Sequence, residues 1–293
     1  MPQSGEVSEY RLTGPGRQDP ARLLAFVGAH AIPGLEAWDG ATYARILGLP
    51  GGPGVAAVTA ADGGYDVTLH LLDPADRPAA IDRLRHLLAV DRDGANADAH
   101  LARDPLLAPL VARRPGLRPP GSVDHAETLV RTVIGQQVSL AGARALGARL
   151  VAAHGRPLPP DWREVWPGLT HAWPTAAALA ALDPADPALA MPARRARTVV
   201  AAARTVADAR GSLPPTAELL ALPGVGSWTS DYVDLRCRAA PDVFLPGDLA
   251  VRRALERLGL LAVSPRSAAS LAAAWTPYRS VALMHLWADY LGL

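Results

Sequence analysis

The chain has 293 residues, of which 49% are hydrophobic, so one or two domains with a buried core are expected. The formal net charge is only +1, so the overall charge does not indicate a nucleic-acid binder, and no run of about 20 apolar residues predicts a membrane span. A single cysteine, Cys237, excludes an intrachain disulfide and a four-cysteine iron–sulfur cluster. Residues 1–9 lack a basic segment followed by an apolar stretch, so we expect no secretory signal and a cytoplasmic protein.

The first third of the chain mixes helix and strand patterns. Residues 19–30 predict a helix, because Asp19 suits the N-cap, Pro20 suits the first helical position, and the apolar residues that follow share one face. Three short strands and a second helix follow, at residues 43–49, 54–59, 64–72 and 78–91. These elements predict a small α+β domain over residues 1–95, and the polar, turn-rich residues 91–97 mark its boundary.

Residues 96–293 predict an all-helical region without a convincing strand. Residues 113–121 indicate a linker and residues 157–173 an irregular segment, and the long stretch 124–154 is expected to break near Gly135 or Val138-Ser139. The expected helical stretches are residues 100–112, 124–154, 175–182, 187–208, 216–221, 227–239, 248–258 and 265–291. The fold class is therefore α+β, with the mixed domain first and the helices after it.

A glycine-rich turn lies between two of these helical stretches. It reads Leu222-Pro223-Gly224-Val225-Gly226, and two glycines one residue apart suit a tight hairpin with an exposed backbone. The N–H groups of such a turn, opening into a helix N-terminus, form a site for an anion. These five residues alone are a weak motif, because many loops contain them.

An aspartate opens the next helical stretch. Asp248 follows Phe244-Leu245-Pro246-Gly247 and precedes an apolar-periodic segment, so it is expected at the N-cap, held in place and ionised. A capping aspartate is most often only a cap. Its position after a phosphate-type hairpin, with Trp228 and Tyr232 on the helix between them, makes the combination more specific than either part.

This combination resembles the helix-hairpin-helix DNA glycosylases, and more closely the bacterial 3-methyladenine DNA glycosylase II (AlkA-type) family. The resemblance covers nearly the whole chain. Besides the hairpin, it rests on residues 24–26, 43–45, 115–118, 135–139, 278–280 and 285–287. It implies an N-terminal domain built around an antiparallel sheet, and a monomeric enzyme that takes alkylated purines, 3-methyladenine first, out of double-stranded DNA.

The resemblance assigns roles to residues that match family motifs. Asp248 matches the catalytic aspartate, whose charge stabilises the positive charge that builds on the sugar as the N-glycosidic bond breaks. An alkylated purine is already cationic, so it leaves without a general acid, and stacking on indole adds a cation–π contribution of about 0.5–2 kcal/mol. The matching base-pocket residues are Phe26, Trp228, Tyr232 and Trp287, and the matching DNA-binding residues are Gly224, Gly226, Ser227 and Gln137.

Three further expectations follow from matching positions. Gln137 stands where the family places an apolar side chain that fills the gap left by the flipped base, so either Gln137 is a polar wedge or Val138 contributes. The hairpin carbonyls of Leu220, Leu222 and Val225 match the ligands of a monovalent cation, Na⁺ or K⁺, and no other cofactor is required. Relatives that also cut the strand hold a lysine where this chain has Trp228, and the sequence contains no lysine, so we expect a monofunctional enzyme.

Two alternatives remain open from the sequence. One is a glycosylase for another lesion, such as hypoxanthine or an ethenoadduct. The other is a non-catalytic DNA-binding protein that uses the same hairpin, for which Asp248 would have no chemical role. Some bacteria fuse this kind of enzyme to an alkyl-transferring regulator, so the chain either stands alone or is one piece of a longer protein.

Overall fold

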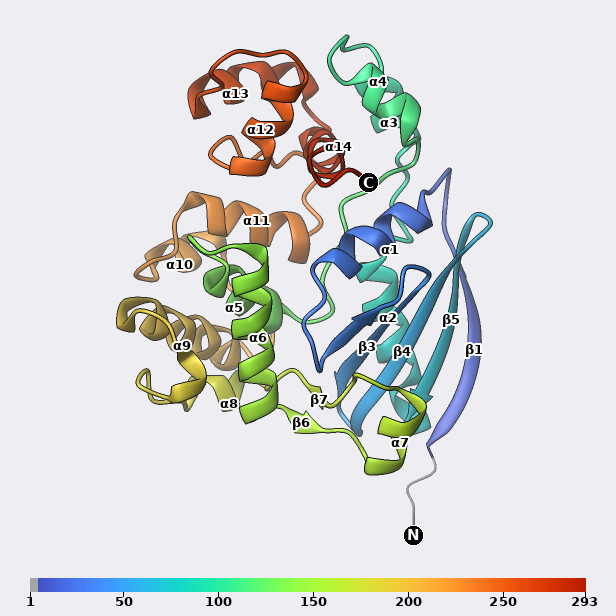
Figure 1. Ribbon diagram of the computed structural model, residues 1–293, viewed down its shortest axis with the longest axis vertical. Helices are drawn as coiled ribbons and strands as arrows, with labels where there is room; N and C mark the ends of the chain where they lie inside the picture. The colour runs from blue at the N-terminus through green and yellow to red at the C-terminus, as the bar shows by residue number, and fades with distance from the viewer. Residues whose placement is uncertain (1–4) are drawn as a thin grey trace.

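A five-stranded antiparallel sheet forms the N-terminal part of the computed structural model, which describes residues 5–293. The expectation about a secretory signal concerns residues 1–9, and residues 1–4 of these lie outside the described part. The strand order is β1-β5-β4-β3-β2 (Figure 1). The strands are β1 (Glu6–Thr13), β2 (Glu36–Trp38), β3 (Thr42–Leu49), β4 (Gly52–Ala61) and β5 (Gly64–Leu71).

The three predicted strands correspond to β3, β4 and β5, whereas β1 and β2 were not predicted. β1 is an edge strand with one buried residue, Leu12, so its sequence lacks the apolar alternation of a half-buried strand. β2 has only three residues and pairs with β3 alone. Both missed strands therefore form through pairing with a neighbour rather than through a local pattern.

Helices cover both faces of the sheet. α1 (Pro20–Ala29) begins as predicted, because the side chain of Asp19 accepts a hydrogen bond from the Arg22 N–H. α2 (Arg77–Leu87) follows the sheet, after a 3₁₀ turn at Pro74–Asp76, and packs with α1 in one hydrophobic cluster. The opposite face of β3 and β4 packs in a second cluster with α5 (His125–Ile134) and α6 (Leu140–His154).

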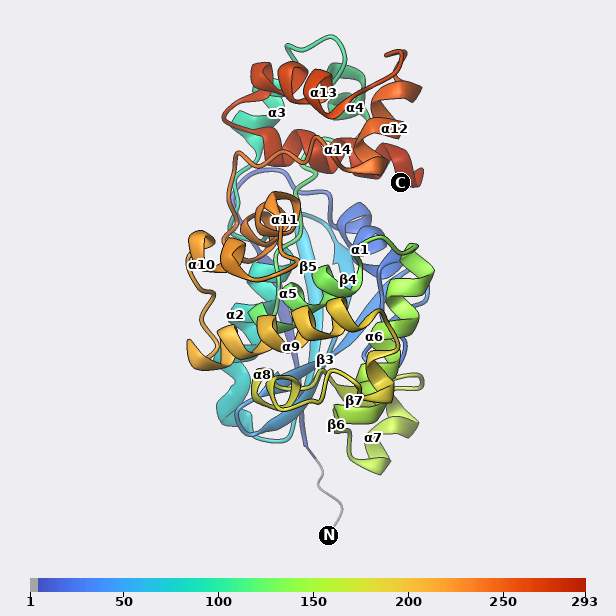
Figure 2. The same ribbon diagram turned by 90° about the vertical axis from the view of Figure 1, so that its left-hand side faces the viewer.

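The helices outside the sheet domain form an upper and a lower group in Figures 1 and 2, and α10 and α11, which flank the hairpin, lie in the lower one. One group holds α3, α4, α12, α13 and α14, and the other holds α5 to α11. The bounds are α3 (Ala95–Leu101), α4 (Ala108–Arg113), α7 (Pro160–Val165), α8 (Ala176–Ala180), α9 (Ala193–Asp208), α10 (Thr216–Ala221), α11 (Ser227–Cys237), α12 (Leu249–Arg257), α13 (Pro265–Ala272) and α14 (Arg279–Leu291), with 3₁₀ turns at Pro187–Leu189 and Ala273–Trp275.

Predictions for the helical region need correction at residues 156–173 and at residues 100–112. Residues 156–173 include a two-stranded ladder, β6 (Arg156–Pro157) with β7 (His171–Ala172), and the helix α7, so the region is neither strand-free nor irregular there. The helix predicted over residues 100–112 is two helices, because the Asp104 side chain accepts from the N–H groups of Leu106 and Leu107 and turns the chain. The predicted break near Gly135 is confirmed, since α5 ends at Ile134 and α6 begins at Leu140.

Both hydrophobic clusters join residues from the two sides of the predicted boundary at residue 95. The first unites the sheet and α1 with α12 and α14, and the second unites the sheet with α5, α6 and α9. The division into residues 1–95 and 96–293 therefore stays a prediction. Within residues 5–293, none of the helices is both long and apolar enough for a membrane span.

Candidate active site

The hairpin between α10 and α11 has the geometry that its glycines require. Gly224 has φ +90°, and a Cβ there would lie 2.7 Å from the Thr198 Oγ1, so both the backbone and the packing favour glycine. Gly226 is extended and faces open space, and both glycines and Ser227 are exposed. Val225 is buried between them and anchors the turn.

The N-terminus of α11 is open to an anion. Gly226 is its N-cap and provides no side chain to accept from the first-turn N–H groups. These N–H groups lie at the N-terminus of an 11-residue helix, which is the positive end of its dipole. The exposed backbone of Gly226 and Ser227 can therefore approach a phosphate closely.

The loop between α5 and α6 is tied to the hairpin. Gln136 donates from its side-chain Nε2 to the Gly224 carbonyl and to the Thr229 Oγ1, each at 3.0 Å. The next residue, Gln137, is exposed and has φ +57°, a left-handed conformation that a non-glycine residue adopts at a cost. Val138 is also exposed, so both wedge candidates lie on the surface beside the hairpin.

Asp248 caps α12, as predicted. Its Oδ1 accepts from the Val251 N–H at 3.0 Å and from the Trp287 indole Nε1 at 3.3 Å. Among the described residues, its other carboxylate oxygen has no hydrogen-bond partner and the side chain makes no ion pair. The carboxylate is therefore oriented through one oxygen and free at the other.

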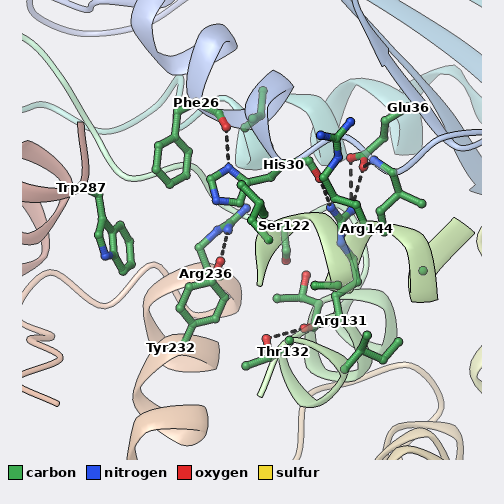
Figure 3. A pocket seen from close by; sticks show the side chains of 18 of the residues that line it. Phe26, His30, Glu36, Ser122, Arg131, Thr132, Arg144, Tyr232, Arg236 and Trp287 are labelled. Carbon is green, nitrogen blue, oxygen red and sulfur yellow. Dashed lines mark hydrogen bonds and ion pairs between the residues drawn. The ribbon is translucent and has the colours of Figure 1, made fainter. Parts of the chain in front are cut away.

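A cavity of about 570 Å³ brings together Asp248 and the four predicted aromatic residues. Trp287 connects them, because its ring lies 6.0 Å from the rings of both Phe26 and Tyr232 (Figure 3). Its indole N–H also donates to Asp248. Trp228 stacks on Tyr232 with ring centroids 5.4 Å apart. Phe26 and Trp287 are buried, whereas Trp228 and Tyr232 are half-buried, so the apolar wall continues from the interior to the surface.

The inner wall of the cavity carries a buried network of charges. Arg45 contacts Glu36 at 3.3 Å and Glu127 at 2.9 Å, and Arg131 contacts the same two carboxylates at 3.1 and 2.8 Å. Burial alone would raise the pKa of Glu36, but the neighbouring Arg131 and Arg45 lower it to about 2. Two guanidinium groups offset two carboxylates, so this wall is polar without a net charge.

Two more pocket residues were missed in the sequence, although each follows a predicted one by four positions. His30 lies four residues after Phe26, and Arg236 lies four after Tyr232, so each shares a helix face with its neighbour. Arg236 donates to the Tyr232 hydroxyl at 2.6 Å, and to the Gly121 carbonyl through Nε and Nη2. This helical spacing is the signal that could have identified both.

The hairpin carbonyls suit the predicted cation in chemical type. Leu220 lies in the last turn of α10, where carbonyl groups have no partner within the helix. The Leu222 carbonyl accepts from the Val225 N–H at 3.0 Å, and its second lone pair remains available. Among residues 5–293, no group of three or more His, Cys, Asp and Glu residues is arranged to hold a metal ion.

Sequence comparisons identify related proteins. The family described as the AlkA N-terminal domain matches residues 16–124. DNA-3-methyladenine glycosylase 2 of Escherichia coli is 34% identical over 292 residues, which cover 95% of this chain and 96% of that protein. A protein of Mycobacterium tuberculosis, described as a probable bifunctional transcriptional activator/DNA repair enzyme AlkA, is 39% identical over 278 residues. That match covers 90% of this chain but 53% of the relative, so the chain spans about half the length of the mycobacterial protein.

Solved structures show the same fold at low sequence identity. The 3-methyladenine DNA-glycosylase of Archaeoglobus fulgidus superposes with a TM-score of 0.80 at 20% identity, over 96% of this chain and 98% of that one. An 8-oxoguanine glycosylase/lyase of Clostridium acetobutylicum, in complex with double-stranded DNA, gives a TM-score of 0.69 at 18% identity, over 92% and 91% of the two chains. The α+β arrangement of an antiparallel sheet followed by helices is thus that of the helix-hairpin-helix glycosylases, as predicted.

Proposed function

The chain belongs to the AlkA-type DNA-3-methyladenine glycosylase family, and from this premise we propose that it releases alkylated purines from duplex DNA by hydrolysis. The proposed substrates are 3-methyladenine and the 7-methylguanine class. The proposed partner is double-stranded DNA that contains such bases, bound by a monomer. The proposal goes beyond family membership because it assigns a reaction and a substrate class to this chain.

One observation carries the proposal: a carboxylate with a free oxygen lies in the same cavity as four aromatic side chains. The Val251 N–H and the Trp287 indole hold the Oδ1 of Asp248, and the second oxygen is left for a substrate. A non-catalytic DNA-binding protein needs neither this oxygen nor an aromatic cavity behind it. The arrangement therefore favours the enzyme over the binding module.

The surrounding elements have complementary tasks in this proposal. Backbone N–H groups of Gly224, Gly226 and Ser227 grip a phosphate independently of sequence. Gln137, on a loop anchored to the hairpin through Gln136, fills the gap in the duplex. The extruded base enters the cavity and stacks on its aromatic wall, since a base inside the duplex cannot be reached.

The chemistry then needs one negative charge. As the N-glycosidic bond breaks, its electron pair moves to the base nitrogen, and an alkylated cationic purine leaves as a neutral molecule. Positive charge on the sugar is stabilised by the carboxylate of Asp248. The oxygen of a water molecule bonds to C1′, its proton passes to Asp248 or to solvent, and the products are a free base and an abasic site.

Two further parts of the proposal concern strand cleavage and the cation. The sequence offers no lysine amine for a Schiff base, and Trp228 lies at the start of α11, so the strand stays intact. The carbonyl groups of Leu220, Leu222 and Val225 would hold Na⁺ or K⁺ and stiffen the hairpin. Weaker duplex binding when choline replaces both cations at equal ionic strength supports this role, and unchanged binding contradicts it.

Replacement of the aspartate tests the proposal. Asp248→Asn keeps the side-chain shape and an acceptor for the Val251 N–H but removes the charge. We expect release of 3-methyladenine from methylated duplex DNA to fall at least about 100-fold, because the carboxylate acts on charge that develops in the transition state. Duplex binding, measured by fluorescence anisotropy, should change less than about threefold.

A survey by mass spectrometry of the bases that the wild-type protein frees from alkylated DNA identifies the lesion. Release of 3-methyladenine with an unbroken strand on a denaturing gel is the expected result. Unchanged release by Asp248→Asn would refute the catalytic assignment. A wild-type protein that binds duplex DNA and frees no base would establish the binding module instead.

A further inference from the structure

His30 is a polar side chain in the aromatic part of the cavity. It directly follows the last residue of α1. Its backbone N–H donates to the carbonyls of Gly28 and Val27, and not to that of Phe26 one turn earlier. The His30 Nδ1 lies 2.7 Å from that carbonyl, and its ring packs against Phe26 in a tilted arrangement with the ring centroids 4.6 Å apart. A carbonyl oxygen only accepts hydrogen bonds, so Nδ1 carries the proton.

The other ring nitrogen is therefore an acceptor in the neutral ring. Within residues 5–293, the Nε2 of His30 makes no hydrogen bond, and the ring lies between Phe26 and Tyr232, facing the space beside Trp287 (Figure 3). Burial, with the nearby charges of Arg236 and Arg131, lowers the pKa of His30 to about 4, while the hydrogen bond to the Phe26 carbonyl opposes this shift. The ring is thus neutral at pH 7, and its lone pair is available.

Arg236 and Tyr232, beside the aromatic rings, already bond to each other or to the backbone. Arg236 has no acceptor atom, and three of its nitrogens donate to Gly121 and Tyr232. The Tyr232 hydroxyl accepts one of these bonds. Asp248 bonds to the Trp287 indole and is assigned to the sugar in the proposed reaction. A base among these rings therefore meets, in the Nε2 of His30, an acceptor that has no partner among the described residues.

We propose that His30 is a specificity-determining residue, whose Nε2 accepts a hydrogen bond from an N–H group of the extruded purine. This inference rests on the proposed function and adds a polar criterion to the aromatic stacking. 3-Methyladenine offers its exocyclic amino group, and 7-methylguanine offers a ring N–H and an amino group. 1,N⁶-ethenoadenine has no N–H on its base, because the etheno bridge occupies both nitrogens.

The selectivity follows from the cost of an unmatched polar group. A base with an N–H donor satisfies the acceptor, whereas ethenoadenine places a lone pair or carbon against it and leaves it desolvated without a partner. His30 therefore favours purines with a free N–H over those that are bridged. Cation–π stacking also favours the cationic methylpurines over neutral ethenoadenine, but this contribution is the same in the wild type and in the His30 variants.

The test compares two bases in one protein preparation. We would measure kcat/KM for release of 3-methyladenine and of 1,N⁶-ethenoadenine by the wild type, His30→Leu and His30→Gln. His30→Leu should lower the value for 3-methyladenine about tenfold and leave that for ethenoadenine unchanged or higher. His30→Gln, whose amide oxygen is an acceptor, should restore part of the preference.

The ratio of the two values is independent of the fraction of folded protein, so partial misfolding of a variant does not imitate the result. An unchanged ratio in His30→Leu, with both values equal to or below those of the wild type, would overturn the inference and leave the proposed glycosylase activity intact. A ratio that falls equally in His30→Gln would show that ring packing, and not the acceptor, determines the preference, which also overturns it. Loss of release in the wild type itself would instead refute the proposed function.

Discussion

Gln137 has a backbone conformation that favours glycine, although its side chain is a candidate for the wedge in the duplex. With φ +57° it occupies the left-handed region, where glycine is favoured by about 1 kcal/mol over other residues. The side chain is exposed, so it buries little surface that would offset this cost. Backbone strain at such a place is consistent with a requirement for the side chain itself, as a wedge in the duplex.

The substitution Gln137→Gly separates these two requirements. We expect the free energy of unfolding to stay equal or rise by about 0.5–1 kcal/mol, because glycine relieves the strain. Single-turnover excision from duplex DNA should fall about tenfold, because nothing then fills the gap left by the base. Urea denaturation and excision kinetics measure the two effects.

Arg210→Gly is the matched control for this change. Arg210 is another exposed residue with positive φ, at +53°, and it lies beyond the end of α9, outside the cavity. Relief of strain there should leave excision unaltered. Normal excision by Gln137→Gly would assign the gap to Val138 or to another group.

At the scale of single residues, the sequence located side chains that have a local signature. Asp248 was predicted because an N-cap is visible in the sequence, and its bond to the Val251 N–H confirms the cap. For His30 and Arg236 the only local signal is the helical spacing from Phe26 and Tyr232, which does not by itself place a side chain in a cavity. Their position in the cavity depends on α1 and α11, which are about 200 residues apart, coming together in the fold.

At the scale of elements, the sequence predicted the helices and strands that have a local pattern. It did not predict the strands that form only by pairing with a neighbouring strand. The break between α5 and α6 was visible as Gly135 and as the capping side chain of Ser139. β1 depends on its ladder with β5, and β7 on two residues that pair with β6. Such short or exposed strands have no core-facing period of their own, so no sequence window reveals them.

The sheet and α5 are joined by the buried charge network, which no local pattern predicts. Glu36 lies on β2, Arg45 on β3, and Glu127 and Arg131 on α5. Arg45→Met would leave two buried carboxylates with a single guanidinium. We expect the free energy of unfolding to fall by about 3–5 kcal/mol, measured by urea denaturation at pH 7.

Arg11→Met provides the comparison for an exposed ion pair. Arg11 pairs with Asp66 across β1 and β5 at 2.7 Å, but both side chains are about half exposed. Loss of this ion pair should lower the free energy of unfolding by less than about 1 kcal/mol. Equal effects of the two substitutions would mean that the buried network adds nothing beyond an ordinary surface pair.

At the scale of the whole molecule, the cavity lies where the two hydrophobic clusters meet. Phe26 and Trp287 come from the first cluster, and Glu127 and Arg131 from α5, which packs in the second. The sequence indicated the order of the α+β and helical parts. It did not indicate that both clusters span them, because that is a property of long-range packing.

His285 makes the stability of the packed core depend on pH. It lies on α14 with no exposed surface, and neither ring nitrogen has a hydrogen-bond partner among the described residues. Burial, together with the charge of Arg114, lowers its pKa to about 3. Below pH 6.5 the unfolded chain binds a proton here that the native protein does not, so stability falls as the pH falls from 6.5 toward 3.

We therefore expect His285→Leu to make the protein less sensitive to acid. Between pH 6.5 and 4.5 the slope of the unfolding free energy against pH should decrease by up to about 1.4 kcal/mol per pH unit. This is the slope that the uptake of one proton on unfolding contributes. At pH 7 the variant should be more stable by about 1 kcal/mol, because leucine fills the space without burying unpaired polar atoms. Met284→Leu, at the adjacent buried position, controls for repacking of α14 and should leave the slope unchanged. A slope that His285→Leu does not alter would mean that the ring is protonated in the native protein at these pH values, in which case Arg114 and the helices around it must move to accommodate the charge.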